Sequence, residues 1–266
     1  MQKSCPDILK KIVETKKEEL KFSKVKIKDH QIAIKDIPIA LDFYSALNKQ
    51  HLAVIAEIKK ASPSAGIITD NFEPEKIADA YNSGNADAVS ILTDKSYFKG
   101  DIQYIPLVRN IITKPILRKD FIISEYQIYE ARANGADSFL LISAILDSFQ
   151  LKDFLDLGRE LKMEALVESH TEYELENAIN AGTKIFGINN RNLHNFKVDL
   201  NTSIQLYDLI PENSLSVTES GISTAQDATT LAQKGFNAVL IGESLMRSGI
   251  DAAPEKIKQF QQAKYI

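Results

Sequence analysis

The stretch "SGNADAVSIL" (residues 83–92) places a glycine, a short polar linker and an apolar run in direct succession. The same order recurs in "NGADSFLLIS" (134–143), "AGTKIFGINN" (181–190) and "KGFNAVLIGE" (234–243). Glycine commonly ends a helix, because it takes the left-handed conformation at little cost. The four glycines lie 47 to 53 residues apart, which leaves room for two strand–helix units in each interval: Gly84, Gly135, Gly182 and Gly235.

Further apolar runs lie between these stretches and bring the number of expected strands to eight. They are "AVIAEI" (53–58), "PILRKDF" (115–121), "MEALVES" (163–169) and "LSVTES" (214–219). Helical patterns fill the intervals at 74–83, 125–134, 172–181 and 224–234, the last with Thr224 as N-cap. Strands that are continuously apolar are typical of a parallel sheet covered by helices. The sequence therefore predicts a (β/α)8 TIM barrel.

A doubly wound open sheet is the alternative architecture. It is disfavoured because no G-x-G-x-x-G follows the first strand and because eight repeats are many for that fold. We expect residues 1–266 to form a single (β/α)8-barrel domain, with residues 1 to about 50 as an N-terminal helical extension. In that extension apolar residues recur at helical spacing, so we expect an amphipathic helix with its lysines on a solvated face. The apolar positions are Ile8, Leu9, Ile12, Val13 and Leu20.

Composition excludes several classes of protein. No apolar run approaches the 18 to 20 residues that a membrane helix needs, and the charged N-terminus lacks a signal-peptide core. The single cysteine, Cys5, excludes an internal disulfide and a cysteine-based zinc site. The net charge of −4 disfavours a nucleic-acid binder. The histidines lack metal-ligand spacing and there is no P-loop, so we expect a cytoplasmic protein without metal or cofactor.

Polar residues end most of the expected strands, which is where the active site of such a barrel lies. Glu57 and Lys59 share one face of the first strand, because alternate residues point the same way. The same alternation brings a set of polar side chains into one cavity from five strands: Glu57, Lys59, Lys119, Glu168, Asn189 and Glu219. One such residue alone is readily a structural ion pair, whereas the set indicates a catalytic site. A Schiff base at Lys59 or Lys119 is a further possibility.

The last two strands carry a different signal. "ESGIS" (219–223) and "IGESLMRSG" (241–249) each place glycine and serine between a strand end and a helix start. Free backbone N–H groups at such positions bind anions, and the loops after the seventh and eighth strands of a barrel often hold phosphate. We therefore expect a phosphorylated substrate.

Several long motifs resemble those of the indole-3-glycerol phosphate synthase family. They are "AEIKKASPSAG", "SILTDKSYFKG", "PILRKDFI", "GINNRNL", "TESGI" and "LIGESLMR", in order between residues 53 and 247. The N-terminal "ILKKIVETKKEEL" is similar to the start of that family as well. The resemblance implies an enzyme of tryptophan biosynthesis, a carboxy-lyase that converts 1-(2-carboxyphenylamino)-1-deoxyribulose 5-phosphate to indole-3-glycerol phosphate, carbon dioxide and water.

The resemblance also implies roles for individual residues. Lys119 is the first general acid and Glu168 acts in dehydration, while Glu57 and Asn189 bind hydroxyls and orient the lysines. Lys59 holds the anthranilate carboxylate or shares the acid role. Lys119 has no acid on its own face of its strand, so we expect it to be the better proton donor. The implied substrate-binding set is Ser62, Phe121, Leu141, Arg191, Glu219, Ser220, Gly221, Leu240, Gly242, Glu243 and Ser244.

Two rival functions remain at this point. Phosphoribosylanthranilate isomerase is a barrel enzyme with a related substrate, but its acid–base pair is typically Asp and Cys, and Cys5 is far from any strand end. A non-catalytic barrel that binds a phosphometabolite is the other, against which the Lys119–Glu168 pair argues. We expect a small-molecule partner, no nucleic acid or membrane, and a monomer or weak homo-oligomer.

Overall fold

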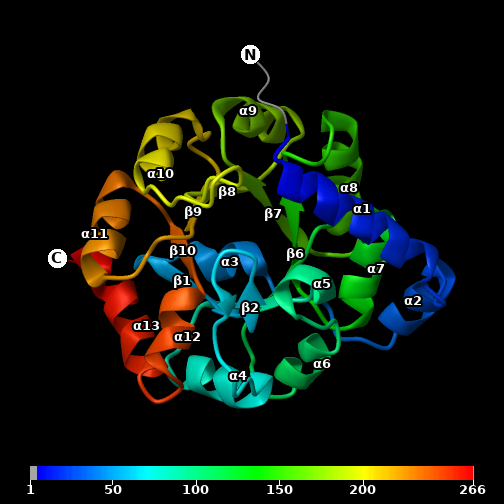
Figure 1. The fold of residues 1–266 in the computed structure, drawn as a ribbon, viewed down its shortest axis with the longest axis horizontal. Coiled ribbons are helices and arrows are strands. Elements are labelled where there is room, and N and C mark those ends of the chain that lie inside the picture. The colour runs from blue at the N-terminus through cyan, green and yellow to red at the C-terminus, as the bar shows by residue number, and fades with distance from the viewer. Residues whose placement is uncertain (1–4, 266) are drawn as a thin grey trace.

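The computed structural model describes residues 5–265, and its centre is a closed barrel of eight parallel strands (Figure 1). Neighbours around the barrel follow the order β1, β10, β9, β8, β7, β6, β5 and β4, and β4 pairs with β1 again. This confirms the predicted (β/α)8 barrel, and closure rules out an open sheet. The strands are β1 (Ala53–Ile58), β4 (Ala88–Leu92), β5 (Ile116–Lys119), β6 (Ser138–Ile142), β7 (Glu164–Ser169), β8 (Ile185–Asn189), β9 (Leu215–Glu219) and β10 (Ala238–Ile241).

The barrel has two separate apolar layers because alternate strand residues point to opposite sides. Ile55, Leu166 and Leu240 belong to the cluster that fills the barrel. Val54 and Phe186, on the other side of their strands, belong to the larger cluster that joins the barrel to its helices. All of these side chains are fully or almost fully buried. Burial on both faces explains why the strands read as continuous apolar runs.

Helices surround the barrel, and the four predicted ranges match α4, α7, α9 and α11. Thr224 caps α11 as expected: its hydroxyl accepts from the N–H of Asp227, whose carboxylate accepts from the N–H of Thr224. No helix within residues 5–265 combines the length and apolarity needed to cross a membrane. The helices that follow the first strand are α4 (Pro74–Ser83), α5 (Lys95–Phe98), α6 (Tyr104–Arg109), α7 (Glu125–Ala133), α8 (Ser148–Glu160), α9 (Glu172–Asn180), α10 (Asn201–Leu206), α11 (Ala225–Lys234), α12 (Glu243–Ser248) and α13 (Ala253–Gln261), with 3-10 turns at Tyr207–Leu209 and Gln262–Tyr265.

Three of the four repeated glycines take the left-handed conformation expected of a helix cap, but Gly84 does not. Its φ is −74°, and the left-handed residue there is Asn85, with φ 56°. Glycine is needed at position 84 for a different reason: a Cβ would lie 2.8 Å from the Cα of Pro254 in α13. The glycine therefore allows α4 and α13 to pack closely, a contact between segments far apart in the sequence.

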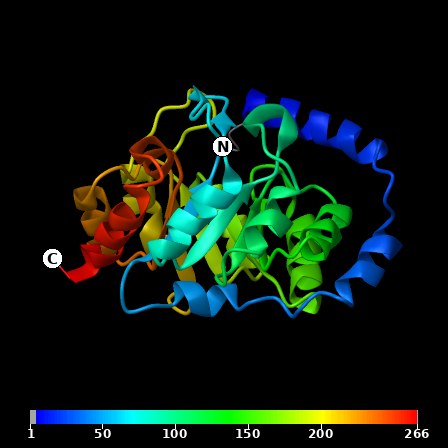
Figure 2. The same cartoon turned by 90° about the horizontal axis from the view of Figure 1, so that it is seen from below.

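The N-terminal extension forms α1 (Asp7–Lys21), α2 (Ile27–Ile34) and α3 (Phe43–Leu47). In Figure 2, α1 (dark blue) lies over the same end of the barrel as the hairpin of β2 (Ala61–Ser62) and β3 (Gly66–Ile67), while α3 lies at the opposite end. Leu9 and Ile12 of α1 join the inner apolar cluster from above, and Phe43 and Leu47 of α3 join the same cluster. The extension thus covers both ends of the barrel.

One lysine of α1 corrects the expectation of a fully solvated lysine face. The Lys16 side chain is buried, and its Nζ lies 2.9 Å from Asp94 and 3.1 Å from Asp120. Burial disfavours the charge, but the carboxylates of Asp120 and Asp94 outweigh burial and raise the pKa of Lys16. Lys16 therefore ties α1 to the segments that follow β4 and β5.

We expect Lys16→Met to lower the free energy of unfolding by about 3 kcal/mol, because it leaves the buried Asp94 without its cation and leaves Asp120 with Arg118 alone. The Michaelis constant should rise as well, since α1 lines the mouth of the barrel. Urea denaturation and steady-state kinetics measure the two effects, and Lys17→Met, at the exposed neighbouring position, is the matched control. Equal stability and kinetics of the two variants would contradict this account of α1.

Candidate active site

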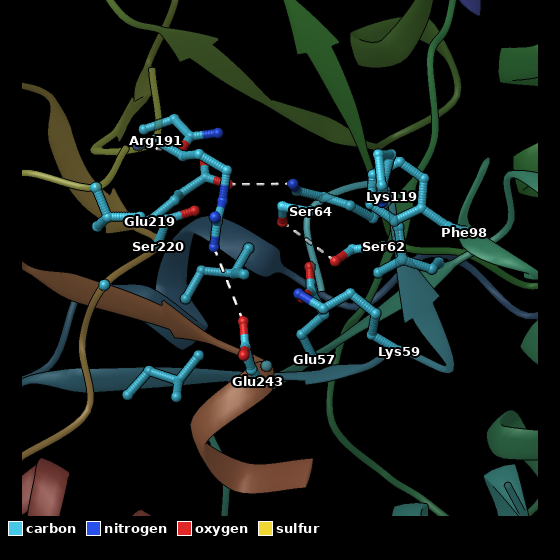
Figure 3. Close-up of a pocket in the computed structure, with 18 of the residues that line it drawn as sticks. Glu57, Lys59, Ser62, Ser64, Phe98, Lys119, Arg191, Glu219, Ser220 and Glu243 are labelled. Atoms are coloured by element: carbon cyan, nitrogen blue, oxygen red, sulfur yellow. Dashed lines mark hydrogen bonds and ion pairs between the residues drawn. The ribbon is translucent and has the colours of Figure 1, made fainter. Parts of the chain in front are cut away.

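A cavity of about 610 Å³ opens at the C-terminal ends of the strands, a size typical of small-molecule sites (Figure 3). All predicted site residues except Leu141 line this cavity. They are Glu57, Lys59, Ser62, Lys119, Phe121, Glu168, Asn189, Arg191, Glu219, Ser220, Gly221, Leu240, Gly242, Glu243 and Ser244. The strand ends therefore bring together side chains that lie far apart in the sequence.

Strand alternation explains how these charges reach the cavity. Glu57 follows Ile55 on the inward face of β1, Lys119 follows Leu117 on β5, and in each case the apolar residue belongs to the inner cluster. The polar residue lies one step nearer the mouth. The apolar layer beneath excludes water and holds the backbone, so the polar layer above it is rigidly placed.

Lys119 lies at the centre of the polar layer. Its Nζ is 3.3 Å from Glu219 Oε2 (Figure 3). The same Nζ is 3.4 Å from Glu168 Oε2. Burial disfavours the ammonium form, but the carboxylates of Glu219, Glu168 and Glu57 outweigh it and raise the pKa of Lys119. Lys119 has no acid on its own face of its strand, as predicted, but it has two carboxylate partners from β7 and β9, so it is ion-paired as Lys59 is. A raised pKa also disfavours a Schiff base, which needs a neutral amine.

Lys59 forms the expected ion pair with Glu57 of the same face. Burial favours the neutral form of Glu57, but Lys59 and Lys119 outweigh it and lower the pKa of this carboxyl. Lys59 lies just past the end of β1 and points into the cavity beside Glu57 (Figure 3). An ammonium group there can receive an anionic group of a substrate.

Glu168 and Glu219 share Lys119 but differ in their affinity for a proton. For Glu168, Lys119 and His170 outweigh burial and lower the pKa. For Glu219, burial and the charge of Glu168 prevail over the opposing effect of Lys119 and raise the pKa to about 7. Two close carboxylates cannot both ionise freely, so near neutral pH this pair often retains one proton.

Two glycines on the inward face make room for these carboxylates. A Cβ at Gly187 of β8 would collide with Glu219, and a Cβ at Gly242 would collide with Glu57. Gly242 was expected at the phosphate end, whereas Gly187 was not expected at all. A glycine inside a strand often marks a place where another group approaches the backbone closely. The glycine in "GIN" (187–189) was therefore a sequence signal that could have predicted this contact.

The loops after β9 and β10 form the other end of the cavity. Ser220 and Gly221 both have positive φ, 65° and 85°, and Gly242 immediately precedes α12. Ser220 is not a glycine, so its left-handed conformation carries strain of the kind that collects at functional loops. The first backbone N–H groups of a helix have no partner within the helix, so these loops and the start of α12 remain the predicted phosphate site.

Sequence reasoning missed two cations at this end, because neither belongs to a strand. Arg247 of α12 and Lys256 of α13 line the cavity beside the predicted Arg191. Lys256 donates to the carbonyl of Ser244 at 3.1 Å, and Arg247 pairs with Glu243 at 2.9 Å. Three cations around the loop ends favour a dianionic ligand.

An apolar wall completes the cavity, and it corrects the prediction for Leu141. That side chain belongs to the outer cluster, between the strands and the helices, so it does not reach the cavity. Its neighbours Leu140 and Ile142 point inward and line the cavity instead. Phe121 packs against Phe98, with ring centroids 5.9 Å apart. Such a wall suits the aromatic ring of a substrate.

Asn189 and Ser62 occupy the rim between the two ends. The side-chain oxygen of Asn189 accepts from the N–H of Arg191 at 3.0 Å, so its amide nitrogen remains for Glu168 or a substrate. The Ser62 hydroxyl accepts from the N–H of Ala65 at 3.1 Å within the β2–β3 hairpin, which lies over the mouth. The alternative isomerase function would need a cysteine in the active site. Cys5 lines a neighbouring cleft and not this cavity.

Solved structures show that the fold is a common one. Thiamine phosphate pyrophosphorylase from Pyrococcus furiosus superposes with a TM-score of 0.61 at 15% identity, over 83% of this chain and 99% of that chain. A tryptophan synthase complex from Pyrococcus furiosus gives a TM-score of 0.55 at 15% identity, over 80% of this chain and 98% of that chain. At such low identity the likeness concerns the fold alone.

Sequence comparison is far more specific. The family profile described as indole-3-glycerol phosphate synthase matches residues 9–259. A protein of that name from Caldanaerobacter subterraneus subsp. tengcongensis is 46% identical over 252 residues, 95% of this chain and 98% of the relative. Another from Legionella pneumophila (strain Paris) is 48% identical over 242 residues, 91% of this chain and 94% of the relative. With the barrel and its charged mouth, these matches show that the chain belongs to the indole-3-glycerol phosphate synthase family.

Proposed function

We propose that Lys119 supplies the proton for ring closure in the family's reaction, which forms indole-3-glycerol phosphate from 1-(2-carboxyphenylamino)-1-deoxyribulose 5-phosphate. One observation carries this proposal. The Lys119 ammonium group lies at the floor of the cavity between Glu168 and Glu219, with an apolar wall on one side and the loops of β9 and β10 on the other. An extended substrate with a ring at one end and a phosphate at the other fits that arrangement.

In the first step the ring carbon that bears the carboxylate attacks the ketone carbon. The C=O electron pair moves to oxygen, and this oxygen takes a proton from Lys119 to become a hydroxyl. The raised pKa of Lys119 ensures that the ammonium form is present at the start. Transfer is still favourable, because an alkoxide is a much stronger base than an amine.

The second step releases carbon dioxide, and the electrons of the broken bond restore the aromatic ring. Lys59 holds the carboxylate until it leaves, beside its partner Glu57. In the third step Glu168 takes the proton from the ring nitrogen, and the electrons of this bond expel the hydroxyl as water. A proton is then lost from the neighbouring CH2 carbon and one is returned to nitrogen, which gives the indole. Glu219, with a pKa of about 7, is positioned to give the hydroxyl its proton.

The reaction itself is tested with the synthetic substrate. The purified protein should produce indole-3-glycerol phosphate, detected by its indole fluorescence, and carbon dioxide in equal molar amounts. An isomerase would release no carbon dioxide, and a binding protein would leave the substrate unchanged, so either of these results would refute the proposal. Cytoplasmic location and a monomeric or weakly homo-oligomeric state remain predictions, which fractionation and sedimentation can check.

We expect an analogue of the substrate without its phosphate to bind roughly 10²-fold more weakly or worse, because several hydrogen bonds to a charged group are lost. Ser220→Ala and Ser244→Ala should cost much less, since most of the donors at this end are backbone N–H groups and cations. Calorimetric titration of a non-reacting analogue, with and without phosphate, makes the comparison. Equal affinity of the two analogues would place the phosphate elsewhere.

A further inference from the structure

His170 lies directly after β7 and contacts two carboxylates at once. Its Nε2 is 3.5 Å from Glu168 Oε1, and its Nδ1 is 3.2 Å from Glu174 Oε2. The side chain is only 12% exposed. No motif in the sequence assigned His170 a function, yet it touches the carboxylate on which the last step of the reaction depends.

Glu174 fixes the orientation of the imidazole ring, on the side of the ring that faces away from Glu168. Glu174 stands in the first turn of α9, where its carboxylate also accepts the backbone N–H of His170 at 2.8 Å. Its own N–H is held by the N-cap residue Thr171. Because the helix start holds Glu174, and Glu174 holds Nδ1, the opposite nitrogen Nε2 stays within ion-pair distance of Glu168, although it makes no hydrogen bond to it.

The charge of His170 follows from its surroundings. Burial disfavours the imidazolium, but Glu174, Glu168 and Glu219 outweigh burial and raise the pKa of His170. The ring lines a second cleft beneath the start of α1, which adjoins the cavity that Glu168 lines and shares Asn189 and Arg191 with it. Other charged or titratable groups around that cleft are Cys5, Lys10, Asp147, Glu172, Tyr173, Glu176, Arg191 and His194.

The order of the reaction shows what a second cation beside Glu168 contributes. Lys119 is the other cation in contact with Glu168, on Oε2, and by the proposed mechanism it gives up its proton during ring closure. A buried carboxylate that lost its one partner would take up a proton and cease to be a base. His170, on Oε1, keeps its charge through that step.

We propose that His170 is a positioning residue, whose imidazolium keeps Glu168 ionised and oriented after Lys119 has given up its proton. The inference rests on the proposed role of Glu168 in dehydration. It predicts that ring closure is largely insensitive to His170, whereas dehydration depends on it. The Michaelis constant should change little, because the ring does not line the substrate cavity.

The expected pH dependence has a definite sign. His170 is charged below its raised pKa, so the cation is present throughout the acid range in which Glu168 titrates. In His170→Asn the fall of kcat on the acid side should move to higher pH by about one unit or more. Within that range, kcat is then about tenfold lower than in the native enzyme.

Two further variants test whether the charge is responsible. His170→Lys retains a cation and should move the fall of kcat at low pH part of the way back to its native position. His194→Asn, an exposed histidine at the same cleft, is the matched control and should leave the profile unchanged.

A titration followed by nitrogen-15 NMR of the imidazoles tests the contact without relying on activity. The midpoint of His170 should lie above 6.5 in the native enzyme and should fall by about one unit in Glu168→Gln, because the partner charge is gone. An unchanged midpoint, or a His170→Asn profile that matches the native one, would overturn the inference. A fully active Glu168→Gln with the midpoint shifted would instead refute the proposed role of Glu168 and leave the contact established.

Discussion

Turnover of Lys119→Met is expected to fall by about 10³-fold, which lies within the usual range for removal of a general acid. Methionine keeps the length and apolar stem of the side chain but has no proton to give, so the ketone oxygen cannot be neutralised as the ring closes. Substrate should still bind, because the phosphate end and the apolar wall are intact. Steady-state kinetics together with calorimetric binding of a non-reacting analogue separate the two effects.

Lys114→Met is the matched control for that change. Lys114 lies just before β5, at the opposite end of the barrel from Lys119. Its replacement should leave turnover unchanged. Because Lys119→Met leaves Glu168 and Glu219 without their shared cation, its stability should be compared with that of the native protein by urea denaturation. Turnover near the native level in a folded Lys119→Met protein would show that the ring closes without this lysine.

Glu168→Gln should lower turnover by roughly 10²-fold or more. Glutamine has nearly the same shape as glutamate but cannot take the proton from the ring nitrogen. The ring-closed intermediate should then accumulate, because the step that fails comes after ring closure. A quenched single turnover, analysed for substrate, intermediate and product, measures this directly.

Glu164→Gln provides the control on the same strand. Glu164 begins β7 at the far end and pairs with Lys184 at the surface, 2.6 Å away. It should retain full activity. If Glu168→Gln also forms product at the native rate, Glu168 has no part in dehydration.

The barrel could be predicted from the sequence because its signals are local. Each strand is a short apolar run, and several helix starts carry a capping side chain, as Thr224 does at α11. Alternation then placed four residues on the inward face: Glu57, Lys119, Glu168 and Glu219. A charged residue at the end of an apolar strand indicates which face of that strand points into the barrel. Where both neighbours are apolar, as at Leu140 and Leu141, alternation alone does not decide which one points inward.

Contacts between distant segments are what the sequence did not disclose. Lys16 is one of many lysines in its helix, and only the folded chain brings it to Asp94 and Asp120. Gly84 resembles an ordinary helix cap until α13 is packed against it. Arg247 and Lys256 reach the predicted phosphate end of the cavity from helices, outside the strand-end positions that alternation can assign.

The division of labour between the two lysines is the central claim, and one measurement tests it most directly. Single-turnover ring closure is followed for Lys119→Met and Lys59→Met, beside the dissociation constant of a carboxylate-bearing analogue for each. We expect Lys119→Met to bind the analogue and fail to close the ring. Lys59→Met should close the ring more slowly than the native enzyme, with the larger loss of affinity. Ring closure at the native rate in Lys119→Met, together with its loss in Lys59→Met, would reverse the two roles and contradict the account.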